Sequence, residues 1–147
     1  MSQLLARLQR DLNDSRRSQN KPLTLLLGTA LADVKNRRIE LRRDLTDEDV
    51  QDVLRKASKR RREAAGQFDA AGRPDVGDRE RNEAATLELY LPASAPDDEI
   101  RAAVAAAIVA GAGNIGAVMG KVMPQFKARA DGSRINSIAR EELSRRG

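Results

Sequence analysis

The residues of this chain that could do chemistry are cations, clustered carboxylates and a few serines. None of the 147 residues is histidine, cysteine or tryptophan. This composition excludes histidine-based triads, thiol nucleophiles, disulfide scaffolds and zinc sites built from cysteine and histidine. Ser94, Ser133 and Ser137 therefore have no imidazole to activate them, and no lysine lies close enough in sequence to suggest a serine and lysine pair. We expect no catalysis by this chain alone and no cofactor.

The acidic cluster formed by Asp47, Glu48, Asp49 and Asp52 is the only sequence pattern that could suggest a metal site. Oxygen ligands of this type bind Mg²⁺, but acids are also common in the first turn of a helix, where they complement the helix dipole. We favour the second interpretation, because the cluster coincides with a predicted helix start. No metal is expected.

A glycine-rich run, GAGNIG at residues 111–116, matches the dinucleotide-binding pattern G-x-G-x-x-G, and Asp131 follows it about 20 residues after the first glycine. That motif depends on a β-strand that delivers the pyrophosphate to a helix N-terminus. The preceding segment, IRAAVAAAIVA, is predicted to be helical instead. The glycines are better interpreted as the end of a helix.

Positive charge is the remaining candidate for function. Lys and Arg exceed Asp and Glu by 27 to 22, and from Met119 onward seven cations accompany three acids. Clustered cations can contact phosphates, or can simply be solvated helix faces. Because aromatic residues make up only 2% of the chain, RNA would be recognised through its backbone and shape, and no DNA specificity is expected. The candidate cations are Lys121, Lys127, Arg129, Arg134 and Arg140.

The elements that position these residues are all predicted to be helices. Alanine and leucine dominate the apolar residues while β-branched and aromatic residues are scarce, a balance that favours an all-α fold. Leucines recur at helical spacing from Leu4 to Leu12, and again after Pro22. Thr46 followed by Asp49 predicts the N-cap of a third helix. Its predicted apolar face consists of Val50, Val53, Leu54, Ala57, Ala64, Ala65 and Phe68.

A glycine and a proline within residues 71–75 predict the turn of a long helical hairpin. If the hairpin folds about Gly72, Arg61 faces Glu83, with Glu80 one turn closer to the turn. We therefore predict a structural ion pair between Arg61 and these acids that sets the register of the hairpin. The alternative is that Arg61 extends its guanidinium into water while its stem packs on the helix.

Residues 92–96 form the only connector bracketed by prolines, and we place the domain boundary there. The expected organisation is an N-terminal helical domain, residues 1–91, with the long hairpin, and a small C-terminal three-helix bundle, residues 97–147. The longest apolar stretch, Pro22 to Ala32, is shorter than the ~20 residues that span a bilayer. We expect no membrane association and a cytoplasmic location.

Three segments carry a resemblance to a known family. QFDAAGRPD at 67–75, Tyr90-Leu91-Pro92, and IGAVMGKVMPQFKARADGSRIN at 115–136 resemble the small bacterial YqeY-like proteins of the GatB/YqeY family. From Gly120 onward the chain is also similar to the C-terminal tail of the GatB subunit of glutamine-dependent tRNA amidotransferases. The residues that match the tail motif are Gly120, Lys127, Arg129, Ala130, Asp131 and Asn136.

The resemblance implies a helical module that holds tRNA or another structured RNA, with Lys127 and Arg129 facing phosphate and Asn136 in the same site. It also implies amidotransferase or aminoacyl-tRNA synthetase-type partners. A further alternative that it implies is a carbon-nitrogen ligase activity, with glutamine as amide donor, that this chain exerts only together with partner subunits. The leading hypothesis is a non-catalytic RNA-binding module accessory to tRNA amidation. The alternative is a protein-interaction adaptor that does not bind RNA and uses the leucine and alanine faces of the first two helices.

Overall fold

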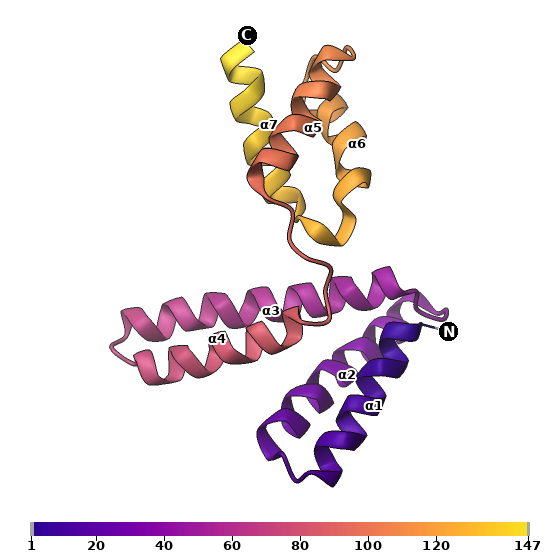
Figure 1. Ribbon diagram of the computed structural model, residues 1–147, viewed down its shortest axis with the longest axis vertical. Helices are drawn as coiled ribbons and strands as arrows, with labels where there is room; N and C mark the ends of the chain where they lie inside the picture. The colour runs from indigo at the N-terminus through magenta and orange to yellow at the C-terminus, as the bar shows by residue number, and fades with distance from the viewer. Residues whose placement is uncertain (1, 147) are drawn as a thin grey trace. The chain divides into compact units, whose positions relative to one another are not determined.

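The structure, a computed structural model, describes residues 2–146, and every regular element in this range is helical. The elements are α1 (Gln3–Arg17), α2 (Lys21–Leu41), α3 (Asp47–Ala70), α4 (Pro74–Glu88), α5 (Asp97–Val109), α6 (Ile115–Phe126), the 3₁₀ turn η1 (Lys127–Arg129) and α7 (Gly132–Arg146) (Figure 1). The predicted all-α class is confirmed. Within the described range, no helix has both the length and the apolar character needed to cross a membrane.

The chain divides into two compact units, an N-terminal unit of residues 1–91 and a C-terminal unit of residues 92–147. Each unit has its own cluster of buried apolar side chains. In the N-terminal unit, α1 and α2 pair with each other and pack on α3, while α4 runs beside α3 (Figure 1). Leu8, Leu27 and Leu54, one from each of the first three helices, are fully buried at the centre of this unit.

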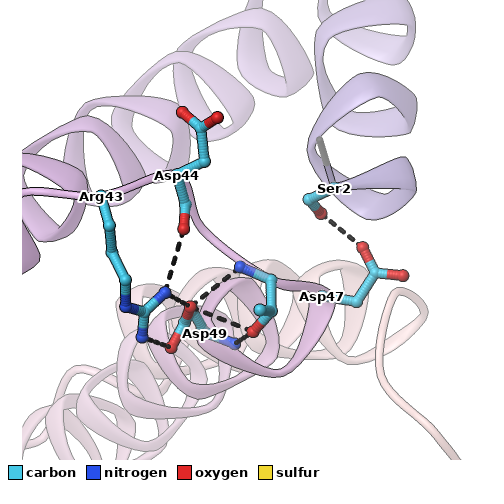
Figure 2. A network of polar contacts seen from close by, with 6 residues as sticks. Ser2, Arg43, Asp44, Asp47 and Asp49 are labelled. Carbon is cyan, nitrogen blue, oxygen red and sulfur yellow. Dashed lines mark hydrogen bonds and ion pairs between the residues drawn. The ribbon is translucent and has the colours of Figure 1, made fainter.

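The N-termini of α1 and α3 are joined by a polar network (Figure 2). Asp47 accepts hydrogen bonds from the Ser2 hydroxyl and from the backbone N–H of Leu4, at 3.1 Å. An Asp side chain at the start of one helix therefore satisfies a free N–H at the start of another. The hydrogen bond from Ser2, followed by that from Leu4, lowers the pKa of the Asp47 carboxyl.

Thr46 and Asp49 form the capping box at the start of α3. The Thr46 hydroxyl accepts from the Asp49 N–H at 3.2 Å, and Asp49 Oδ2 accepts from the Thr46 N–H at 2.8 Å. Arg43 adds two hydrogen bonds to the same carboxylate, at 2.7 and 3.2 Å (Figure 2). The bonds from Arg43, and then from Thr46, hold the pKa of Asp49 far below its usual value. Asp47 and Asp49 of the acidic cluster thus stabilise the starts of α1 and α3.

The hairpin of α3 and α4 turns at Gly72, whose φ of +76° is readily adopted only by glycine. Charged pairs join the two helices. Arg62 binds both oxygens of Glu88, at 2.6 and 2.7 Å, and Arg81 binds both oxygens of Asp69, at 2.7 and 3.2 Å. Bidentate geometry of this kind orders both side chains.

Two details of packing differ from the sequence expectation. Phe68, which was predicted on the apolar face of α3, is 36% exposed. It lies close to the hairpin turn, beyond the part of α3 that α1 and α2 cover. Leu26 and Ala30 are buried, although the leucine repeat of α2 does not include them. The repeat follows a single line of side chains along the helix, and the buried face of α2 is wider than that line.

The C-terminal unit consists of α5, α6 and α7, each of which contacts the other two. Its core is lined by fully buried aliphatic residues from all three helices, with Ile100, Val118, Val122 and Ile135 at or below 1% exposure. Asn114 caps α6 by accepting from the N–H of Ala117 at 2.9 Å. Alanines fill most of the remaining core, and this permits three short helices to approach closely.

Candidate nucleic-acid interface

Lys127 and Arg129, two of the cations predicted to bind nucleic acid, lie at the junction between α6 and α7. Lys127 is exposed and ends α6 with a positive φ of 33°, which is uncommon for a residue with a side chain. The 3₁₀ turn that follows carries Arg129. Asp131 then caps α7 by accepting a hydrogen bond from the N–H of Arg134 at 2.8 Å. Local backbone geometry therefore fixes the turn between α6 and α7 that carries these cations.

Arg129 is held by an acid of its own unit. Its two terminal nitrogens lie 2.8 and 2.9 Å from the two carboxylate oxygens of Glu99, and its Nε donates to the carbonyl of Ala93 at 3.4 Å. These hydrogen bonds lower the pKa of Glu99 and raise that of Arg129. The charge of Arg129 is therefore balanced within the bundle.

Arg134 is held in the same way. Its Nε lies 2.9 Å from Asp97 Oδ1 and its Nη1 lies 3.1 Å from the Ser94 hydroxyl. Its Nη2 donates to the carbonyl of Ala95. Together with the hydrogen bond from the Ala95 N–H to the Arg129 carbonyl, at 2.8 Å, these contacts fasten the segment that precedes α5 to the start of α7. Arg129 and Arg134 act here as structural residues.

The last cations of the chain surround a buried acid. Glu142, which is 6% exposed, has Arg101 at 3.2 Å, Arg145 at 3.1 Å and Arg146 at 3.8 Å. Arg101 also pairs with Glu141 at 3.1 Å. Much of the positive charge at the C-terminus is thus compensated inside the unit.

Arg140 has a different environment. Its Nε donates to the amide oxygen of Asn136, one helical turn earlier, at 2.7 Å. An amide orients the guanidinium without neutralising it. Within residues 2–146, no carboxylate pairs with Arg140 or with the exposed Lys121 on α6. These two residues keep their charge available to an external anion.

Four of the six predicted residues therefore fall into two groups. Arg134 lies on the side of α7 that contacts α5, as does Glu141 seven residues later, whereas Asn136 and Arg140 lie on another side of that helix. The structure brings Asn136 and Arg140 together, and it brings Arg129 and Arg134 to the segment before α5. It shows no direct contact between these two groups among the described residues.

The predicted structural pair also has a defined geometry. Arg61 Nε lies 3.1 Å from Glu83 Oε2, and Arg61 Nη1 donates to the carbonyl of Ala57 at 3.2 Å. The Arg61 side chain is only 16% exposed, so its guanidinium does not extend freely into water. Glu80 makes no hydrogen bond or ion pair with the described residues.

The other two sequence motifs differ in geometry from the ligand sites that their patterns could suggest. The glycine-rich run joins α5 to α6, with Gly111 at a φ of +112°, and the preceding element is a helix instead of the strand that a dinucleotide site requires. In the part of the chain that the structure describes, no three acidic side chains converge as they would around a metal ion.

Sequence reasoning did not identify Glu99 and Asp97 as the partners of Arg129 and Arg134. The two pairs are separated by 30 and 37 residues along the chain. No pattern of spacing relates residues so distant along a chain. The only available signal was the abundance of acids before Ile100 beside an excess of cations after Met119.

Comparison with known proteins assigns the family. A family model described as Yqey-like protein matches residues 5–143. The chain belongs to the YqeY-like protein family. The YqeY-like resemblance that the sequence motifs indicated is thus confirmed. An uncharacterised protein of the fission yeast Schizosaccharomyces pombe is 33% identical to this YqeY-like chain over 89 residues, which are 60% of the chain and 72% of that protein.

Proposed function

We propose that this YqeY-like protein is a non-catalytic RNA-binding module, and that its C-terminal unit contacts the phosphate backbone of structured RNA. The observation that carries the proposal is the orientation of Arg140. Its guanidinium is exposed at the surface of α7, is positioned by Asn136 at 2.7 Å, and pairs with no described carboxylate. A fixed guanidinium with free donors is well suited to phosphate oxygens.

Lys121 would supply a second phosphate contact, and Lys127 a third. Arg129 and Arg134 would act indirectly, because their bonds to Glu99 and Asp97 keep the unit in shape. The sequence from Gly120 onward resembles the tail of the GatB subunit, and on that resemblance we propose transfer RNA as the ligand and a role accessory to tRNA amidation. Binding by phosphate contact needs no aromatic stacking, which agrees with the scarcity of aromatic residues.

The test is a filter-binding titration of the full chain with bulk transfer RNA at several salt concentrations. We expect affinity to fall steeply with salt, because each phosphate contact releases counterions. Arg140→Gln should weaken binding and reduce the slope of log affinity against log salt by about 0.9, the value for one lost phosphate contact on a duplex. Asn136→Ala should weaken binding less, because the charge remains but loses its orientation.

Arg73→Gln is the matched control, because it removes the same charge from an exposed arginine of the other unit. It should leave the salt slope unchanged. The proposal is wrong if the chain does not bind transfer RNA at low salt, or if Arg73→Gln lowers affinity as much as Arg140→Gln does.

A further inference from the structure

Helix α2 has an apolar surface on both sides. One side faces the core through Leu26, Ala30 and Val34, which are at most 5% exposed. On the opposite side Leu25 is 74% exposed and Ile39 is 64% exposed. Large apolar side chains exposed on the side of a helix away from the core can mark an interaction surface. The outer side of α2 is therefore a candidate for such a surface.

Leu25, Ala32 and Ile39 follow one another at intervals of seven residues, so that they lie along one stripe of the helix. Leu25 and Ala32 also line a surface groove of about 730 Å³. Gly28 lies between them, and a Cβ atom at Gly28 would meet nothing within 4 Å. The small residues leave room for a second helix to approach the backbone of α2 closely.

Three cations border the stripe without acidic partners. Arg16 and Lys21 line one end of the groove, and Lys35 lies two turns beyond Gly28. Among residues 2–146, none of the three forms an ion pair. By contrast, Arg37 and Arg38 of the same helix pair with Glu40 at 2.8 Å and Asp44 at 3.1 Å. Asp33 also lines the groove, but it pairs with Arg60 at 3.3 Å. The charge without a partner beside the exposed apolar stripe is therefore positive.

This charge pattern argues against a second copy of the chain as the occupant. An antiparallel copy centred on Gly28 would place Lys21 of one chain opposite Lys35 of the other, and a parallel copy would place identical lysines together. Like charges in contact oppose association. RNA could use the cations, but it would leave Leu25 and Ile39 uncovered. An acidic amphipathic helix satisfies both the apolar stripe and its cationic border.

We propose that the outer side of α2 is a docking site for an acidic amphipathic helix of another protein. The apolar side of that helix packs on Leu25 and Ile39 and enters the groove at Gly28, and its carboxylates pair with Lys21, Lys35 and Arg16. This site lies in the N-terminal unit and does not depend on RNA binding by the C-terminal unit.

The test uses the full chain and two fluorescent synthetic helices that share one leucine stripe. Glutamates flank the stripe in the first peptide, and lysines flank it in the second. We expect saturable binding of the glutamate peptide by fluorescence anisotropy and at least tenfold weaker binding of the lysine peptide. An excess of transfer RNA should not displace the glutamate peptide.

Variants locate the site. Leu25→Ala should weaken binding about tenfold, as loss of a central interface side chain does, whereas Leu89→Ala, at an equally exposed leucine of the same unit, should have no effect. Gly28→Leu should abolish binding by filling the groove, while the helical circular dichroism is retained. The double variant Lys21→Glu with Lys35→Glu should reverse the preference and favour the lysine peptide.

Several results would overturn the proposal. These are equal binding of the two peptides, equal effects of Leu25→Ala and Leu89→Ala, displacement of the glutamate peptide by transfer RNA, and no binding at all. A dimer by sedimentation that Leu25→Ala dissociates would also reject it, because the outer side of α2 would then be occupied by a second copy. A result for transfer RNA titrated alone bears only on the proposed RNA function.

Discussion

At the scale of single residues, two glycines of the α3 and α4 hairpin have opposite steric environments. A Cβ atom on Gly66 would meet nothing within 4 Å. A Cβ atom on Gly77 would lie 2.3 Å from Asp69 Oδ1 and 3.0 Å from the backbone carbonyl of Ala65. Gly77 is therefore the residue that allows α4 to approach α3, whereas Gly66 only adds flexibility to the unfolded chain.

We predict that Gly66→Ala raises the free energy of unfolding by about 0.5–1 kcal/mol, because alanine has the higher helix propensity. Gly77→Ala should lower it by about 1 kcal/mol, because the added methyl group separates the helices and disturbs the Asp69 and Arg81 pair. Urea denaturation of both variants measures the difference. Equal stabilisation by the two substitutions would show that the close approach at Gly77 is unimportant.

The charged groups at the start of α3 predict an acid dependence of stability. The folded-state pKa of Asp49 is depressed by its hydrogen bonds from Arg43 and Thr46. A depressed pKa contributes stability above the unfolded-state pKa of about 3.9, and that contribution disappears as pH falls toward the folded-state pKa.

We predict that Asp49→Asn has a lower free energy of unfolding than the wild type above about pH 5. This difference should disappear as the pH falls below about 4. Urea denaturation at a series of pH values measures this gap. Asp98→Asn, at an exposed acid that also begins a helix, provides a control. A gap that stayed constant down to acidic pH would contradict the assignment to ionised Asp49.

At the scale of elements, the α3 and α4 hairpin is held in register by charged pairs as well as by its core. Arg62 with Glu88 and Arg81 with Asp69 are largely accessible to water and individually weak. The pair of Arg61 and Glu83 differs, because the arginine is mostly buried. Loss of one partner there leaves a partly desolvated charge.

We predict that Arg61→Glu lowers the free energy of unfolding by about 2 kcal/mol, a value between those of exposed and buried pairs. Adding Glu83→Arg should recover about 1 kcal/mol, because the reversed charges can pair again. Arg60→Glu, at the exposed neighbour of Arg61, should cost less than about 0.5 kcal/mol. If the double variant recovers nothing, the two side chains do not interact in solution.

At the scale of the whole molecule, the two units have separate apolar cores. Leu54 belongs to the N-terminal cluster and Val104 to the C-terminal cluster, and both are fully buried. The C-terminal unit is small, so that its stability depends on few buried side chains. Unfolding of one unit therefore need not unfold the other.

We predict that calorimetry of the full chain resolves two transitions. Leu54→Ala should lower the midpoint of one transition, since it costs about 2–5 kcal/mol of core stability, and Val104→Ala should lower the midpoint of the other. A single transition that both substitutions shift would show instead that the chain unfolds as one cooperative unit.

The sequence by itself determined the features that depend on neighbours along the chain. The helices, the cap at Thr46 and the turn at Gly72 follow from spacing and from local hydrogen bonds. The register about Gly72 also placed Arg61 opposite Glu83, because a hairpin relates residues at equal distances from its turn. The family could also be inferred, because the motifs that indicate it are short and continuous along the chain.

Only the tertiary structure decided which arginines are bound by acidic side chains and which remain available to an external anion. Arg129 and Arg140 look alike in the sequence, yet one is bound to Glu99 and the other is only oriented by Asn136. The exposure of Leu25 beside the buried Leu26 depends likewise on where α1 and α3 pack. Such outcomes come from contacts between residues distant along the chain, which folding brings together and which no local pattern encodes.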